Sequence, residues 1–143
     1  MPAPKRRNTD KQEALIEAIS RAAEKHAPFK NPDQFRRFCA EYFRNVAVDD
    51  IADEDPALLA NAALAHASHA RRLLPGEHAL RIYNPTLGKH GWESAHTVIE
   101  LVHENMPFLV DSLSMALGRV GCDIQLTIHP LIRVRRTAKG SLQ

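Results

Sequence analysis

The sequence predicts an α+β fold: a helical arm over residues 1–76, followed over residues 77–143 by an incomplete β-α-β unit with one extra strand before it. Two observations predict this fold. Apolar residues recur at three- and four-residue spacing as far as Ala70, as they do on one face of a helix, whereas from Ala79 onward apolar and polar residues alternate as they do along a strand. Pro75-Gly76 separates the two patterns and marks the boundary between the two parts.

Helix-start and helix-stop signals divide the arm. Thr9 and Gln12 form a capping-box signature, so the first helix is expected to begin at Thr9 and to end near His26 or Ala27. The remaining helices are expected at three places: from an Asn31-Pro32-Asp33 cap, as a short turn over residues 48–53, and from Asp55-Pro56 to the stop at Pro75-Gly76.

An aromatic stripe is the largest apolar surface of the arm. Phe35, Phe38, Tyr42 and Phe43 line one face of the second predicted helix. We expect this face to pack against the other helices of the arm. The alternative is a docking face for another subunit or domain, because a short helical arm has little core of its own to cover it.

The second part of the chain has the strand patterns. Residues 79–83 and 97–102 are expected to form strands, Pro107 to begin a helix that Gly121 ends, and residues 123–135 to form a further strand that bends at Pro130. One helix on so small a sheet leaves strand edges and a sheet face uncovered. We therefore expect the chain to be a fragment, or another copy or domain to supply the missing strands.

The sequence lacks the motifs of common catalytic and cofactor sites. It contains no GxGxxG after a strand, no GxxxxGK[ST], no GxSxG and no HExxH. His66 and His69 lie three residues apart without a third metal ligand, and Cys39 and Cys122 have no metal-ligand spacing, so both cysteines are expected to be small buried residues. No catalytic, cofactor-binding or metal-binding residue is predicted in this segment.

One loop is a candidate site. It lies between a predicted strand and the start of a predicted helix, where free N–H groups and the helix dipole favour a ligand carboxylate. The loop is a candidate effector-binding or interface loop, and the alternative is that Asn105 only caps the helix. Its residues are His103, Glu104, Asn105, Met106 and Pro107, with Asp111 in the helix that follows.

Composition restricts the partners. The formal net charge of +2 is too small to predict a nucleic-acid partner. No apolar run approaches the length of a membrane helix, and the N-terminus lacks the apolar stretch of a secretory signal. We expect a cytoplasmic protein with neither a nucleic-acid nor a membrane partner.

Several runs carry a family resemblance from Tyr42 onward. They are Tyr83-Asn84-Pro85-Thr86, the stretch from His90 to Glu100, the run Asn105-Met106-Pro107-Phe108-Leu109-Val110-Asp111-Ser112, and residues 128–136. Together they resemble the N-terminal region of the large bacterial NAD-specific glutamate dehydrogenases. The run from Asn105 to Ser112 is the most specific of them.

The resemblance implies a fold and a role. The second part of the chain would be the start of an ACT-like (ferredoxin-like) βαββαβ module, truncated after its second strand at residues 123–135. The parent enzyme would oxidise L-glutamate with NAD to 2-oxoglutarate and ammonia through a catalytic domain far downstream. This segment would then be non-catalytic, with the remainder of the parent chain, other copies in a homo-oligomer and an amino-acid effector as candidate partners.

The resemblance also leaves an alternative open, a free-standing amino-acid-sensing ACT-like binding module. Effector-binding ACT modules typically have a glycine between the first strand and first helix, where the ligand approaches the backbone. The corresponding stretch here, Asn105-Met106-Pro107-Phe108, has no glycine. An assembly role is therefore favoured over effector binding.

Overall fold

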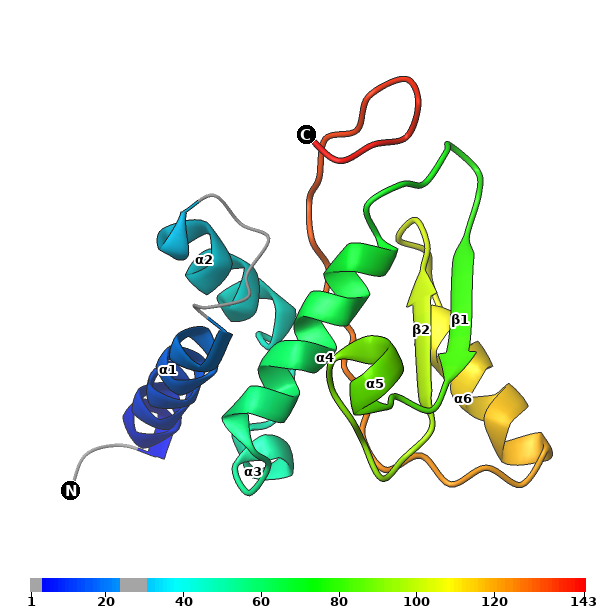
Figure 1. Ribbon diagram of the computed structural model, residues 1–143. Coiled ribbons are helices and arrows are strands. Elements are labelled where there is room, and N and C mark those ends of the chain that lie inside the picture. Colours follow the sequence, from blue (N-terminus) through cyan, green and yellow to red (C-terminus); the bar gives the residue numbers. More distant parts are fainter. Residues whose placement is uncertain (1–3, 24–30) are drawn as a thin grey trace.

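The computed structural model describes residues 4–23 and 31–143 (Figure 1). Within these residues the α+β class is confirmed, with a helical N-terminal arm and an incomplete ACT-like unit around a two-stranded sheet. The elements are α1 (Pro4–Ala23), α2 (Pro32–Tyr42), α3 (Val48–Ile51), α4 (Pro56–His69), β1 (Ala79–Tyr83), α5 (Leu87–His90), β2 (Val98–Val102) and α6 (Leu109–Arg119).

Two helix starts agree with the caps that the sequence predicts. The Asn31 side chain accepts a hydrogen bond from the backbone N–H of Asp33 at 2.9 Å, and Pro32 opens α2. The Asp55 side chain accepts one from the N–H of Ala57 at 3.0 Å, at the start of α4. Each cap satisfies an N–H group that has no partner within its helix.

The predicted start of the first helix is wrong. Thr9 lies inside α1, which begins at Pro4. The residues between them include lysine and arginine, which favour helix, and a proline fits a first turn, so the helix extends upstream of the capping-box signature. The predicted end near His26 or Ala27 falls outside the described residues.

The predicted end of the last arm helix is also wrong. α4 ends at His69 and not at Pro75-Gly76. Beyond it the chain pairs with the C-terminal residues: Arg72 bridges to Ser141, and the N–H of Leu73 donates to the carbonyl of Gly140 at 2.9 Å. These hydrogen bonds require an extended backbone at 72–73, so a tertiary contact ends the helix before the local stop signal.

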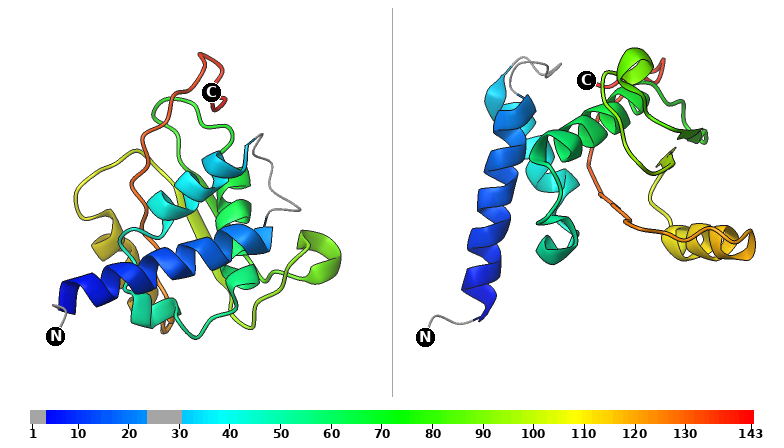
Figure 2. Two further views of the ribbon diagram at one scale, coloured as in Figure 1. Left: turned by 90° about the vertical axis from the view of Figure 1, so that its left-hand side faces the viewer. Right: turned by 60° about the horizontal axis from the view of Figure 1, so that its bottom comes forward.

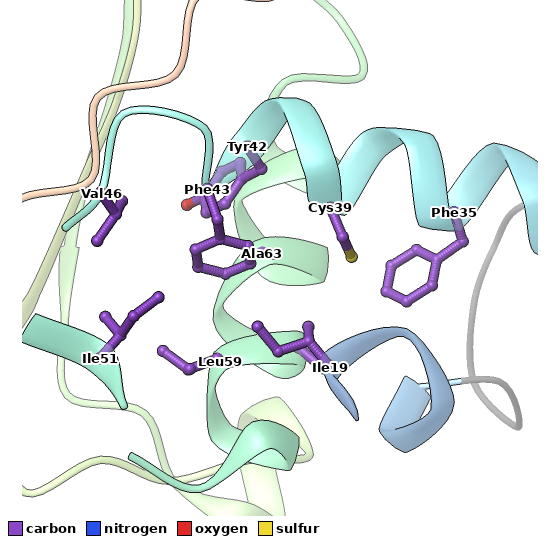
Figure 3. Packing of buried hydrophobic residues seen from close by; sticks show 10 residues of the cluster. Ile19, Phe35, Cys39, Tyr42, Phe43, Val46, Ile51, Leu59 and Ala63 are labelled. Carbon is purple, nitrogen blue, oxygen red and sulfur yellow. The ribbon is translucent and has the colours of Figure 1, made fainter. Parts of the chain in front are cut away.

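The main core lies where α1, α2 and α4 meet (Figure 3). Ile19 of α1 faces Phe35 and Cys39 of α2, and Leu59 and Ala63 of α4 complete the contact. The aromatic rings of α2 also pack on one another, with centroids 5.5 Å apart for Phe38 and Tyr42 and 4.9 Å apart for Tyr42 and Phe43. The remaining buried members of this core are Val46, Ile51 and Ala60.

The sheet consists of β1 and β2, which pair antiparallel with Arg81 opposite Glu100. One face carries Arg81, Tyr83 and Glu100 and lies against α4, where Arg81 reaches the carbonyl of Ala65. The other face carries Leu80 and Ile82, of which 53% and 61% are exposed. The sheet is therefore covered on one side.

The helix after the sheet makes little contact with the rest of the molecule. None of the residues of α6 is buried. In the right-hand view of Figure 2 this helix stands apart from α1 to α4. Its apolar positions, which include Leu109, Leu113 and Leu117, are only half-buried, and Met115 is 59% exposed.

The predicted strand over residues 123–135 is not formed: this segment pairs with no strand among the described residues. Figure 1 shows that the segment first crosses below the sheet from the end of α6 and that its later part then runs in the same direction as β2. In a split βαβ unit, a strand from later in the chain lies between the two parallel strands. An alternating sequence predicts an extended backbone, but it does not show whether a neighbouring strand is present to pair with it. The segment is therefore extended and unpaired.

The buried Gly140 contacts the backbone of the segment that follows α4. Gly140 has a φ of +81°, and a Cβ added to it would lie 2.6 Å from the carbonyl oxygen of Leu73. The arginine Arg72 also donates through Nε to the carbonyl of Lys139 at 3.3 Å. The C-terminal turn therefore docks on the segment that follows α4.

Gly140→Ala is expected to destabilise the fold by about 2 kcal/mol or more, because a left-handed non-glycine residue costs about 1–2 kcal/mol and the new methyl also meets backbone. Gly118→Ala is the matched control: it lies in α6 with an open site and no positive φ, so it should be neutral or stabilise by up to about 1 kcal/mol. Urea unfolding of both variants measures the difference. Equal midpoints would contradict the docking of Gly140.

Candidate functional site

The candidate loop lies between β2 and α6, and its side chains are exposed. The Nδ1 of His103 donates to the carbonyl of Glu104 at 2.7 Å, and the His103 ring stacks on His78 with centroids 6.1 Å apart. The exposed residues are His103, Glu104, Asn105, Met106 and Pro107, together with Asp111.

Asn105 does not cap the helix, so that interpretation is wrong. α6 begins at Leu109, and Phe108 occupies the N-cap position without a side-chain hydrogen bond. The predicted start at Pro107 is therefore also wrong. The residue before a proline avoids the helical conformation, which hinders Met106 from serving as the first helical residue after an Asn105 cap.

The charges around this helix start do not suit an anionic ligand. Asp111 lies in the first turn of α6 and Glu104 precedes it, both exposed. A carboxylate in the first turn already interacts favourably with the helix dipole, and it repels a second carboxylate. The two exposed carboxylates therefore disfavour an amino-acid carboxylate as a ligand of this helix start.

The same loop exposes two large apolar side chains. Met106 is 48% exposed and Phe108 is 77% exposed. Phe108 also has a φ of +62°, in the left-handed region that a bulky residue adopts only at a cost of about 1–2 kcal/mol. An exposed phenylalanine in an unfavourable backbone conformation is a feature typical of contact surfaces and functional loops.

The aromatic stripe of the arm lies in the interior. Phe35, Tyr42 and Phe43 are buried, and Phe38 is partly buried against the same core. In this structure the rings pack between helices and present no continuous apolar surface to solvent.

The sequence prediction missed a polar bridge between the arm and the sheet. His66 of α4 lies 2.8 Å from the Tyr42 hydroxyl through Nδ1 and 3.1 Å from the Leu101 carbonyl through Nε2. A carbonyl only accepts, so Nε2 carries the proton and Nδ1 accepts from Tyr42. Burial lowers the pKa of His66 and raises that of Tyr42, which keeps both groups neutral.

A buried carboxylate lies beside this bridge. Glu100 is 3% exposed, and one of its oxygens accepts from Nε and Nη2 of Arg81 at 3.1 and 2.7 Å. Its other oxygen accepts from the Tyr83 hydroxyl at 2.7 Å. The Arg81 guanidinium also lies 4.2 Å from the centre of the Tyr83 ring, and Trp92 meets that ring edge-on. The charges of the pair are thus fully compensated inside the sheet.

One sequence signal could have found this cluster. Glu100 interrupts an otherwise apolar strand, and Arg81 and Tyr83 occupy alternate positions of the strand before it. Residues at alternate positions share one face, so an unpaired acid there requires a base opposite. Only the pairing register shows which base it is.

The two cysteines differ in environment. Cys39 is buried, and burial raises the pKa of its thiol to about 12, so it remains protonated. Cys122 is exposed, so the expectation that it would be buried is wrong. It follows α6 at the start of the unpaired segment, where no strand covers it.

Neither a metal site nor a membrane span occurs in the described part of the chain. Over residues 4–23 and 31–143, no group of three or more histidine, cysteine, aspartate or glutamate side chains is placed to hold a metal ion. No helix in the same ranges is both long enough and apolar enough to cross a membrane.

The comparison with protein families decides the relationship. The family model described as "Glutamate dehydrogenase, ACT1 domain" matches residues 38–143. The chain belongs to the glutamate dehydrogenase ACT1 domain family. The resemblance found in the sequence is thereby confirmed.

Two relatives of this ACT1-domain chain are both named NAD-specific glutamate dehydrogenase. The protein of Pseudomonas aeruginosa is 33% identical over 125 residues, which cover 87% of this chain and 8% of the relative. The protein of Halomonas elongata is 33% identical over 106 residues, which cover 74% of this chain and 7% of the relative. The chain thus spans less than a tenth of either relative, and no solved structure matches it.

Acidification is expected to weaken the fold of this ACT1-domain chain through His66. Its pKa is lowered from 6.5 by burial, so the folded state binds the proton less readily than the unfolded state. The contribution of neutral His66 to the free energy of unfolding is complete above pH 6.5. This contribution is lost as the pH falls from 6.5 toward the lowered pKa of the folded state. Urea unfolding across this window should show a smaller pH dependence for His66→Gln than for the unaltered chain. Identical pH dependence in both would show that His66 is not the titrating group.

Glu100→Gln is expected to destabilise the domain by about 2–3 kcal/mol, because Arg81 loses its charged partner. The expected loss is smaller than for a fully buried ion pair, since 36% of the Arg81 side chain is exposed. Glu104→Gln makes the same chemical change at an exposed position and should stay within about 0.5 kcal/mol. Thermal or urea unfolding distinguishes the two. Similar losses in both variants would indicate a general charge effect and not the Arg81 pair.

Proposed function

We propose that this chain is a non-catalytic assembly and regulatory segment of a much longer NAD-dependent glutamate dehydrogenase. The parent reaction would convert L-glutamate, NAD and water to 2-oxoglutarate, ammonia and NADH, with NAD bound outside this segment. The observation that carries the proposal is the uncovered apolar surface around the sheet, in an ACT1-family chain that spans 8% of its Pseudomonas aeruginosa relative.

The uncovered apolar surface comprises three parts. One face of the sheet exposes Leu80 and Ile82, and the loop before α6 exposes Met106 and Phe108. The segment after α6 exposes a further set, Ile124, Leu126, Leu131, Ile132 and Val134, each by at least 36%. Large apolar side chains exposed in this number are typical of a contact with another protein segment. Burying it would stabilise the parent enzyme by about 25 cal/mol for each Å² of apolar area.

The polar groups support a structural role. The one buried carboxylate of the described residues, Glu100, is engaged by Arg81 and Tyr83 and is not available to act on a substrate. His66 is bonded to Tyr42 and to the carbonyl of Leu101. These side chains hold the arm and the sheet together. The remainder of the parent chain and other copies of it are the proposed partners, in the cytoplasm.

The double variant Leu80→Asp/Ile82→Asp in the full-length parent is expected to weaken its assembly, because the charges prevent the sheet face from being covered. Sedimentation and thermal unfolding should show a lower mass or midpoint, while KM for glutamate and NAD stays unchanged. Leu87→Asp is the control: this side chain is also 61% exposed but lies on α5, away from that sheet face.

Two outcomes would contradict this function. A large change in KM with intact assembly would place the sheet face in the catalytic machinery. Saturable binding of an amino acid to the 143-residue chain, abolished by Asn105→Ala, would indicate the free-standing sensor.

A further inference from the structure

Exposed carboxylates gather around α3 and the start of α4, and we call this part of the molecule the acidic end. Its side chains are Asp49, Asp50, Asp53, Glu54 and Asp55. Among the described residues, none of these carboxylates forms an ion pair. Arg44, which precedes α3, is paired with Glu41 instead. The negative charge of the acidic end is therefore not neutralised within the described chain.

Cations gather where the C-terminal turn docks on the segment that follows α4, and we call this part the basic end. Its side chains are Arg71, Arg72, Arg135, Arg136 and Lys139, of which Arg136 is half-buried and the others are exposed. Backbone carbonyls hold two of the guanidinium groups: that of Lys139 accepts from Arg72 at 3.3 Å, and that of Gly140 accepts from Arg136 at 3.0 Å. In the part of the chain that the structure describes, none of these cations meets a carboxylate.

The two ends cannot neutralise each other within one chain. In Figure 1 the acidic end lies at the bottom of α4 and the C-terminal turn lies at its top. α4 has 14 residues, so its ends are about 21 Å apart at a rise of about 1.5 Å per residue. Exposed charges are largely screened from each other beyond about 8 Å at physiological ionic strength. Opposite charges can therefore meet only through another molecule or another part of the parent.

The dipole of α4 explains only part of this charge distribution. A carboxylate at Asp55 and a cation at Arg71 suit the two ends of the helix. Arg135 and Lys139 belong to no helix, and the C-terminal turn brings them to the same place as Arg72. Like charges that lie close together repel one another, and an oppositely charged surface removes this repulsion on contact.

We propose that the acidic end of one copy of this chain contacts the basic end of a second copy. The proposal rests on the proposed function, because it takes other copies of the parent as partners and names the surfaces through which they meet. The two ends offer equal numbers of opposite charges, which fix the orientation of a contact and exclude wrong partners. The basic end also has apolar area to bury, since Leu142 is 37% exposed and Val134 is 53% exposed.

Sedimentation of the 143-residue chain at low salt tests the proposal. The unaltered chain is expected to self-associate, and to do so more weakly at about 0.5 M salt, because salt screens exposed charges. Asp53→Lys/Glu54→Lys reverses charge at the acidic end, and Arg135→Glu/Lys139→Glu reverses it at the basic end. Each variant alone should associate at least about tenfold more weakly. An equimolar mixture should recover association, because the intact basic end of one variant can meet the intact acidic end of the other.

Asp111→Lys/Asp123→Lys is the matched control. It makes the same change in net charge as the acidic-end variant, at two exposed positions in and after α6, and should leave association unchanged. The urea midpoints of all variants should equal that of the unaltered chain, because the substituted side chains are exposed. A loss of association with an unchanged midpoint is then a loss of the contact and not of the fold.

Four outcomes would overturn the proposed contact, whether or not the parent oxidises glutamate with NAD. The first is a chain that stays monomeric at low salt, and the second is a mixture of the two reversal variants that fails to recover association. The third is a control that weakens association as much as the acidic-end variant does. The fourth is a loss confined to the basic-end variant, which would assign that surface to another partner. Absence of NAD-linked glutamate oxidation in the parent, with association of the chain intact, would refute the proposed function alone.

Discussion

The joint between α4 and the sheet is polar, and both halves of the structure depend on it. On one side α4 contributes Leu59 and Ala63 to the helical core. On the other it meets the sheet through His66 and the carbonyl of Ala65, which bind Leu101 and Arg81. Hydrogen bonds have fixed directions, so this joint specifies how the sheet lies on the helix more narrowly than apolar contact would.

The two sides of the sheet consequently differ. The side toward α4 buries a compensated charge pair, and the opposite side exposes Leu80 and Ile82. The helix that would cover an open sheet in an α/β unit, α6, has no buried residue. The interior of the described chain is therefore mainly helical, and the sheet adds to it through polar contacts and has little core of its own.

The sequence was sufficient for features determined by neighbouring residues. The Asn31 and Asp55 caps, the strands β1 and β2, and the family relationship all follow from local patterns. Features that depend on distant residues were not foreseeable in this way. α4 ends early because of residues near 140, and residues 123–135 form no strand because alternation does not provide a neighbour. The loop residues from His103 to Pro107 were located correctly between strand and helix, but the position of the cap was not, since Pro107 shifts the helix start.

The contact of Gly140 with Leu73 brings together two points 67 residues apart in the sequence, as the neighbouring bond from Arg72 to Lys139 shows. The sheet and α6 thus belong to one long segment whose first residues, at 72–73, contact its last residues, at 139–140. Units whose ends lie side by side can be inserted, exchanged or enlarged with little disturbance of the host fold. Because its two ends lie together, this segment could differ in length and sequence among related chains while α1, α2 and α4 keep their packing.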